Sequence, residues 1–191
     1  MSIFSNAYEI RLRESCGATD TELTYIKSII QLKWRYNGCT RTLNQQPSEI
    51  LDSWLFQGDW RHANDLVTLD SFSISHVINV ADGISLDQSR KILNIPSRDS
   101  LSVDLLKSFN ETNTFLDECH QQNSRALVHC NRGVSRSSTI ILAYLMYCQK
   151  WTLLQAFEYL LTKRPQASPN KVLLLQLIRY ENELIRRNDE K

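Results

Sequence analysis

The chain has 191 residues, of which 42% are hydrophobic, and its 22 basic residues nearly balance its 21 acidic ones. This composition is typical of one modest globular domain with a substantial core, and the near-neutral charge gives no sign of attraction to nucleic acid or membranes. No run approaches the roughly 18 apolar residues of a membrane span, and neither a signal peptide nor a myristoylation site is recognisable. We expect a cytoplasmic or nuclear protein.

The first part of the chain predicts a helical extension, residues 1–46, with one amphipathic helix. Asp20 or Thr21 can cap this helix. The polar segment 37–48 indicates a linker that leads into one main domain, residues 47–191. The helix packs either on its own domain or against a second copy or partner, and we keep a homodimer through this helix as a hypothesis. One face of the predicted helix carries Leu23, Ile26, Ile30 and Trp34.

Strand-like and helix-like patterns alternate along the rest of the chain. This order predicts an α/β fold with a mainly parallel twisted sheet that is flanked by helices on both faces. Ligands of such sheets bind at the carboxyl ends of the strands. The predicted elements are a strand over 51–57, a helix over 61–72, strands over 76–81 and 91–95, a helix over 102–119, a strand over 126–130, and helices beyond.

The stretch 128–138 reads VHCNRGVSRSS and lies between an apolar strand and a long apolar run, 139–148. The pattern predicts a strand, a tight loop and a buried helix. Backbone N–H groups of such a loop can surround one anion, and the helix points its positive end at it. The sequence therefore predicts a phosphate-binding loop formed by Cys130, Asn131, Arg132, Gly133, Val134, Ser135 and Arg136.

Two side chains of this loop carry the chemistry. Arg136 has a planar, permanently charged guanidinium that can hold two phosphate oxygens and stabilise the negative charge of a phosphoryl transition state. Cys130 lies at the mouth of the same positive field, where thiols ionise readily, so we expect a thiolate nucleophile aimed at phosphorus.

The order His-Cys, five residues, Arg, Ser resembles the signature of the dual-specificity phosphatases, within the cysteine-dependent protein tyrosine phosphatase superfamily. The likeness extends over about residues 47–187, as in a small atypical member. The resemblance implies a cysteine-phosphatase-like fold. It is carried further by Leu55 to Gly58, Val77 to Ala81, Ala143 to Met146, Ala156-Phe157, Lys163 to Pro165, Pro169-Asn170, Gln176-Leu177 and Tyr180-Glu181.

The resemblance also implies a general acid on a loop about thirty residues before the cysteine. Asp99 lies 31 residues before Cys130. We prefer it to Asp104, which reads as a first-turn residue of the following helix. Reaction would pass through a phosphocysteine that water hydrolyses, with Asp99 as acid and then base, and with the Ser137 hydroxyl steadying the departing thiolate. No metal or cofactor is expected.

Several further residues have supporting or purely structural interpretations. His129 is predicted to pack beneath the loop and orient Cys130 by hydrogen bonding, rather than to act as a base. Asn79 and Asn170 either brace the phosphate loop or only satisfy turns, and both readings stay open. Arg132 either favours acidic substrates or is solvated and turned away.

The five cysteines, an odd number without close pairs, indicate a reducing compartment and no disulfide framework. No zinc-binding pattern is present among them and the four histidines. Cys130 is a candidate for reversible inactivation by oxidants. The cysteines are Cys16, Cys39, Cys119, Cys130 and Cys148.

The loop most resembles the loops of those family members that dephosphorylate proteins. We therefore expect a phosphorylated protein substrate carrying phosphotyrosine and phosphoserine or phosphothreonine. A lipid or RNA phosphate is an alternative, although only Arg132 adds a basic side chain within the loop. Two other classes stay open: a phosphate-binding module without turnover, and a sulfur-transferring, rhodanese-like enzyme, against which Arg136 and Ser137 argue.

Overall fold

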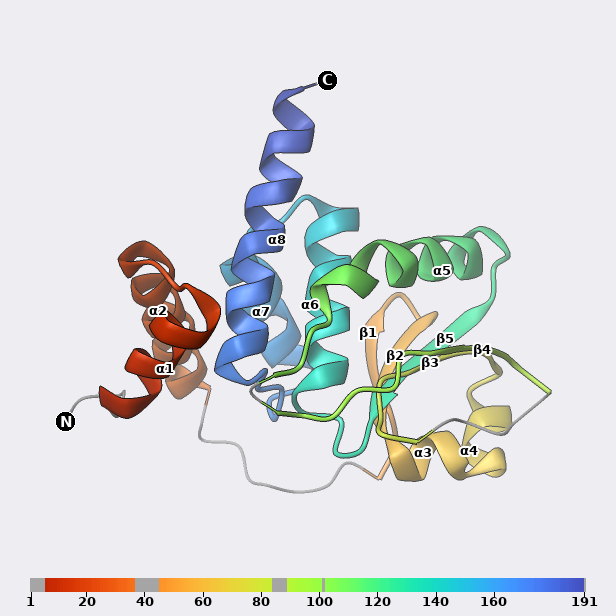
Figure 1. Cartoon of the computed structure of the whole chain (residues 1–191). Coiled ribbons are helices and arrows are strands. Elements are labelled where there is room, and N and C mark those ends of the chain that lie inside the picture. The colour runs from red at the N-terminus through yellow and green to blue at the C-terminus, as the bar shows by residue number, and fades with distance from the viewer. Residues whose placement is uncertain (1–5, 37–44, 84–88, 101, 191) are drawn as a thin grey trace.

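The computed structural model describes residues 6–36, 45–83, 89–100 and 102–190, and it contains a five-stranded sheet in the order β1-β2-β5-β3-β4 (Figure 1). The strands β2, β5, β3 and β4 run parallel, whereas β1 pairs antiparallel with β2. The predicted mainly parallel sheet is therefore confirmed. The strands are β1 (Ser48–Leu51), β2 (Leu55–Asp59), β3 (Ile74–Asn79), β4 (Lys91–Asn94) and β5 (Arg125–Cys130).

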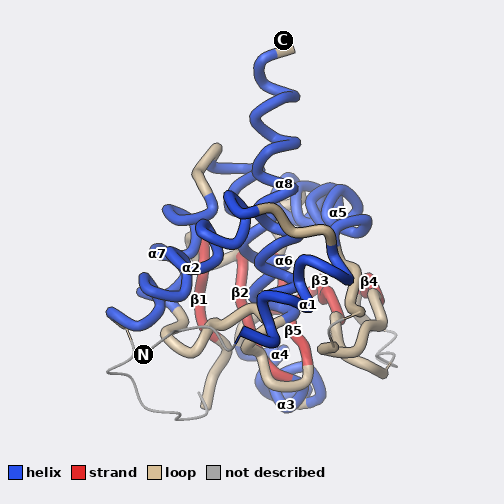
Figure 2. The backbone as a smooth tube through the Cα atoms, turned by 60° about the vertical axis from the view of Figure 1, so that its left-hand side comes forward, coloured by secondary structure: helices blue, strands red, loops and turns tan. Residues whose placement is uncertain are grey.

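Helices cover both faces of this sheet. The short helices α3 and α4 lie on one face, while α5, α6, α7 and α8 gather on the other (Figures 1 and 2). Helix α6 starts directly after the predicted phosphate-binding loop and is buried from Arg136 to Met146. It therefore fixes the loop to the centre of the main core. The helices are α3 (Trp60–Asn64), α4 (Leu66–Ser71), α5 (Phe109–Gln121), α6 (Arg136–Gln149), α7 (Leu153–Lys163) and α8 (Lys171–Asp189).

Three predicted elements differ from the structure. The strand predicted over 51–57 is a hairpin, because a turn after Leu51 separates β1 from β2. The helix predicted over 61–72 is interrupted at Asp65, whose backbone is extended. The helix predicted over 102–119 begins later, with a 3₁₀ turn (Leu106–Ser108) before α5. Periodicity locates a helix better than its ends, where short capping and turn geometries decide.

The end of β5 presents two neighbouring side chains to opposite faces of the sheet, because side chains alternate along a strand. Cys130 belongs to the large core on the side of α6, whereas Leu127 belongs to the small core under α3 and α4. His129, two residues after Leu127, points to the same face of the sheet as Leu127 and lies beside Ala63 of α3. The end of β5 therefore faces a different core on each side of the sheet.

The extension contains two helices, α1 (Asn6–Cys16) and α2 (Asp20–Arg35), where the sequence predicted one. Thr19, rather than Asp20 or Thr21, caps α2 through a capping box with Glu22. Most of the predicted linker, and Cys39, lie outside the described residues.

The buried face of α2 also differs from the prediction. Ile29 is fully buried, while Ile30 is half-buried and Trp34 is 62% exposed. The helix packs against α7 and α8, and Arg179 of α8 donates to Glu22 at 2.9 Å. The extension thus covers its own domain with this face, and the homodimer stays a prediction. The buried residues of α2 are Leu23, Ile26, Ile29 and Leu32.

No described helix combines the length and apolar character that crossing a bilayer requires.

We predict that Ile29→Ala lowers the free energy of unfolding by about 2–5 kcal/mol, because it leaves a cavity between α2 and the core. Ile10 of α1 is 47% exposed, so Ile10→Ala should cost no more than about 0.5 kcal/mol. Urea unfolding of both variants measures the difference. If Ile29→Ala lowered the free energy of unfolding as little as Ile10→Ala does, the packing of α2 on its own domain would be contradicted.

Candidate active site

The loop after β5, which we call the Cys130 loop (residues 130–136), depends on a left-handed backbone at Gly133, where φ is +63°. A Cβ atom there would lie 2.4 Å from the carbonyl oxygen of Gly58 and 2.5 Å from the guanidinium of Arg164. Only glycine fits both this conformation and this close approach. The loop is therefore pressed against the end of β2.

Arg164, at the end of α7, holds the loop in this position. Arg164 is only 1% exposed, and its guanidinium donates to the carbonyl of Gly133 at 2.7 Å, to Ser48 at 2.9 Å and to the carbonyl of Gln57 at 3.3 Å. Burial lowers the pKa of Arg164 to about 10, and the nearby Asp59 acts in the opposite direction. The side chain therefore remains a cation at neutral pH, and its hydrogen bonds offset the cost of its burial.

Cys130 is at the base of the loop and is 2% exposed. Its Sγ lies 3.3 Å from the hydroxyl of Ser137 on the first turn of α6. The amide of Gln57 donates to that hydroxyl oxygen at 3.0 Å. Because the oxygen accepts from Gln57, the hydroxyl hydrogen can point at sulfur and stabilise a thiolate.

Arg136 is positioned by the segments that follow β3 and β4. Its Nη1 donates to a carboxylate oxygen of Asp82 at 2.6 Å and also to the carbonyl of Ser97. Its Nε is buried and has no hydrogen-bond partner within the described residues. A buried donor without a partner is costly, so this nitrogen is suited to a bound anion.

Asp99 meets the loop from the side of α8. Its Oδ1 accepts from the hydroxyl of Ser135 at 3.0 Å and from the amide of Asn170 at 2.7 Å. The backbone N–H of Asn170 in turn donates to Ser135 at 3.1 Å. With Oδ1 held by two donors, Oδ2 is the oxygen that can carry a transferable proton.

The loop encloses a cavity of about 320 Å³, which we call the Cys130 cavity. Cys130 and Asp99 both line it, so the structure brings the predicted nucleophile and the predicted acid together. Arg132 is exposed but also lines the cavity. The full lining is Asp99, Cys130, Asn131, Arg132, Val134, Ser135, Arg136, Ser168 and Asn170.

The remaining predicted residues separate into those near this cavity and those away from it. Asp104 does not line the cavity and precedes the 3₁₀ turn, so its assignment to a first helical turn is wrong; it pairs with Lys107 at 3.8 Å. Asn170 braces Asp99 and caps α8 by accepting from Leu173. Asn79 bonds to Gly83, Asn94 and Ala81, and therefore braces the turn after β3.

His129 faces away from the Cys130 cavity and is 4% exposed. Within the described residues neither ring nitrogen makes a well-aligned hydrogen bond. Burial lowers the pKa of His129 to about 4, which a weak contact with the backbone of Cys130 partly opposes. The ring is therefore neutral at neutral pH. Of the predicted hydrogen bond that would orient Cys130, only this weak backbone contact is found.

From the sequence, no role in the site was assigned to three residues: Asp82, Gln57 and Arg164. Asp82 had a usable signal, because it follows a strand that lies beside β5 and carboxylates at such strand ends can pair with Arg136. The other two act through contacts between elements far apart in the chain. Their partners become visible only in three dimensions.

Among the described residues, no group of three or more His, Cys, Asp or Glu side chains is arranged to hold a metal ion.

Comparisons with known proteins point to one family. Residues 55–183 match the model described as dual specificity phosphatase, catalytic domain. The dual specificity protein phosphatase Mpk3 of Drosophila melanogaster is 37% identical over 145 residues, which cover 74% of this chain. The chain spans only 35% of the length of that relative, 41% of dual specificity protein phosphatase 1 of Mus musculus and 36% of dual specificity protein phosphatase 5 of Rattus norvegicus.

Solved structures agree with this match. The crystal structure of human DUSP28 has a TM-score of 0.70 and 26% identity, covering 76% of this chain and 99% of that one. The human tyrosine phosphatase-like serine/threonine/tyrosine-interacting protein has a TM-score of 0.70 and 27% identity, covering 74% of this chain and 99% of that one. The α/β fold and its flanking helices are thus shared with known structures.

We predict that Gly133→Ala reduces both activity and stability, because the new Cβ would collide with Gly58 and Arg164 in a backbone conformation that alanine disfavours. The conformation alone costs about 1–3 kcal/mol. Gly83→Ala is the matched control for stability, since a Cβ there meets nothing within 4 Å. Thermal and urea unfolding compare the two variants, and equal stability of both would refute the close contact at Gly133.

We also predict a pH dependence of stability that comes from His129. Its folded pKa of about 4 is below the ordinary value of 6.5, so the unfolded chain binds the proton first as the pH falls. The contribution of neutral His129 to the free energy of unfolding is fully present above pH 6.5. Roughly 3 kcal/mol of it is lost as the pH falls from 6.5 to 4.

Urea unfolding between pH 7 and pH 4 measures this contribution, comparing wild type with His129→Gln and with His120→Gln at an exposed position. The wild-type and His120→Gln proteins should lose stability more steeply than His129→Gln. Parallel curves for all three proteins would show that His129 is not buried in its neutral form.

Proposed function

Because the chain belongs to the dual specificity phosphatase family, we propose that it hydrolyses phosphate esters of tyrosine and of serine or threonine in phosphorylated proteins. The observation that carries this proposal is the convergence of Cys130, Arg136 and Asp99 on one cavity of about 320 Å³. These are a nucleophile, a permanent cation and a carboxylic acid, the three groups that hydrolysis of a phosphate ester requires.

In the first step, the thiolate of Cys130 attacks phosphorus and forms an S–P bond. The bond from phosphorus to the ester oxygen breaks, and that oxygen takes the proton of Asp99. Arg136 and the loop amides hold the three other phosphate oxygens, and the pairing with Asp82 fixes the direction of the guanidinium. Positioning and electrostatic stabilisation then supply most of the acceleration.

In the second step, a water molecule attacks the phosphocysteine and gives its proton to the Asp99 carboxylate. The S–P bond breaks, inorganic phosphate is released and the thiolate of Cys130 is restored. The hydrogen bond between Ser137 and sulfur, 3.3 Å in length, stabilises the sulfur as its negative charge returns.

A phosphate-binding module without turnover is the second candidate function, since one structural neighbour is named as phosphatase-like and interacting. Occlusion by the extension would favour it. Within the described residues, however, no residue of α1 or α2 lines the Cys130 cavity. Helix α1 contacts Lys171, the residue after the cavity-lining Asn170, and the centroid of the Tyr8 ring lies 4.0 Å from the Nζ of Lys171.

Binding of a lipid or RNA phosphate would be favoured by a pocket with more basic side chains. The described lining of the Cys130 cavity contains only Arg132 and Arg136 as cationic side chains, and Arg136 is already paired with Asp82. A phosphorylated protein in the cytoplasm or nucleus therefore remains the substrate that we propose.

We predict that the wild-type protein hydrolyses an aryl phosphate in the presence of reductant and chelator, and that Cys130→Ser reduces this to background. Asp99→Asn should lower kcat by about 10²- to 10⁴-fold on a phosphothreonine peptide, because its alkoxide leaving group needs the proton most. The loss should be smaller on an activated aryl phosphate.

Asp104→Asn is the matched control, since it removes the other candidate carboxylate without touching the cavity, and it should retain wild-type activity. Turnover that survives Cys130→Ser would overturn the nucleophile assignment. Absence of turnover in the wild type, with tight binding of the phosphopeptide, would favour the binding module.

A further inference from the structure

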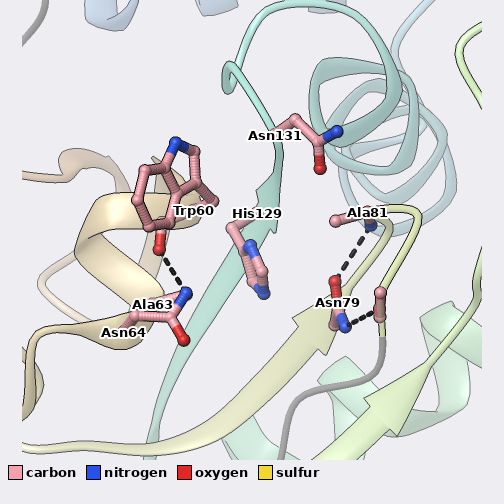
Figure 3. A pocket seen from close by; sticks show the side chains of 8 residues that line it. Trp60, Ala63, Asn64, Asn79, Ala81, His129 and Asn131 are labelled. Atoms are coloured by element: carbon pink, nitrogen blue, oxygen red, sulfur yellow. Dashed lines mark hydrogen bonds between the residues drawn. The ribbon is translucent and has the colours of Figure 1, made fainter.

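A second cavity at the end of β5 lies on the opposite face of the strand from Cys130. Its volume of about 390 Å³ is enough for one large side chain. Figure 3 shows it between α3 on one side and the end of β3 on the other, with His129 between them. The lining residues are Trp60, Ala63, Asn64, Asn79, Ala81, Gly83, His129 and Asn131.

The lining of this second cavity mixes apolar and neutral polar residues, and its described part contains no Lys, Arg, Asp or Glu. His129 adds no charge at neutral pH, because burial favours its neutral form. A second phosphate group would require cationic partners, which this lining does not supply. The lining therefore favours a neutral occupant.

Two side chains of the second cavity, His129 and Asn64, have groups that can form hydrogen bonds to an occupant. The imidazole of His129 is buried at the cavity wall, and neither nitrogen has a well-aligned partner within the described residues. A neutral imidazole offers one donor and one acceptor. The amide nitrogen of Asn64 donates to the carbonyl of Trp60 at 2.6 Å, which turns its oxygen toward the cavity (Figure 3).

The rim of the second cavity offers an aromatic surface. Trp60 is 54% exposed, although an indole ring is costly to leave in water. Its backbone N–H donates to the carbonyl of Asn131 at 3.4 Å, which joins α3 to the Cys130 loop. Asn131 follows Cys130 directly and lines both cavities. A peptide whose phosphorylated residue enters the Cys130 cavity can therefore place a neighbouring side chain here.

We propose that the second cavity is a substrate subsite that binds a neutral aromatic side chain with a hydrogen-bonding group, such as unphosphorylated tyrosine, close to the phosphorylated residue. The ring would stack on Trp60, and its hydroxyl would bond to His129 and Asn64. The inference rests on the proposed function, because it concerns the sequence around the phosphate that Cys130 attacks.

The test uses phosphopeptides in which one flanking position at a time is Tyr, Phe, Ala or phosphotyrosine. At the position that reaches the cavity, Tyr should raise kcat/KM by about tenfold over Ala, with Phe between them. Phosphotyrosine should lose this gain. Equal rates for Tyr and Ala at every position, or a preference for phosphotyrosine, would overturn the subsite.

Variants then locate the effect. Trp60→Ala and Asn64→Leu should each reduce the ratio of the Tyr to the Ala peptide toward one. Val67→Ala changes an exposed apolar residue of α4 outside the cavity and should keep the wild-type ratio. Asn64 is exposed, so its variant is expected to fold even where Trp60→Ala does not. A ratio that neither variant changes would place the preference elsewhere and overturn the assignment.

Binding of the same peptides to Cys130→Ser, measured by calorimetry, separates this inference from the proposed function. If the wild-type protein hydrolyses no aryl phosphate, the proposed function fails, while the affinity ratio of the Tyr and Ala peptides still decides the subsite. If the aryl phosphate is hydrolysed but the affinities are equal, only the subsite is wrong.

Discussion

The contact between the buried guanidinium of Arg164 and the Cys130 loop is the interaction on which the rest of the site depends. It holds the Gly133 carbonyl while also binding Ser48 and Gln57, so one cation joins the loop to β1 and β2. Burying a charge is costly without such partners. A loop held in this way can offer its backbone N–H groups to a phosphate at a lower entropic cost than a flexible loop.

Around this fixed loop, each reactive side chain has a partner from a different element. Ser137 reaches Cys130 from α6, Asp82 directs Arg136 from the end of β3, and Asn170 holds Asp99 from the start of α8. The parallel sheet brings these side chains together, because the carboxyl ends of its strands lie at one edge. Because side chains alternate between the two faces of the sheet along β5, His129 lines a second cavity. In our proposal, one strand end therefore contacts both the phosphate and a neighbouring residue of the substrate.

The sequence predicted the parts of the fold and the site that depend on local pattern. The strand, loop and helix around Cys130 are recognisable from apolar runs and spacing. Asp99 was assigned through the resemblance to the dual-specificity phosphatases, which implies an acid at about this distance before the cysteine. The direction of His129, the role of Asp82 and the buried charge of Arg164 depend on packing between distant segments, which periodicity does not encode. The face of α2 was misjudged at Ile30 and Trp34 for the same reason, because the surface of α7 and α8 selects which residues are covered.

The central claim is that Cys130 carries the phosphoryl group between two steps. The most direct measurement is rapid acid quenching of Asp99→Asn during turnover of an activated aryl phosphate, followed by peptide mass spectrometry. The account predicts one phosphoryl group on the peptide that contains Cys130, and none in Cys130→Ser. Turnover without any modified cysteine, or with the phosphoryl group on another residue, would contradict it.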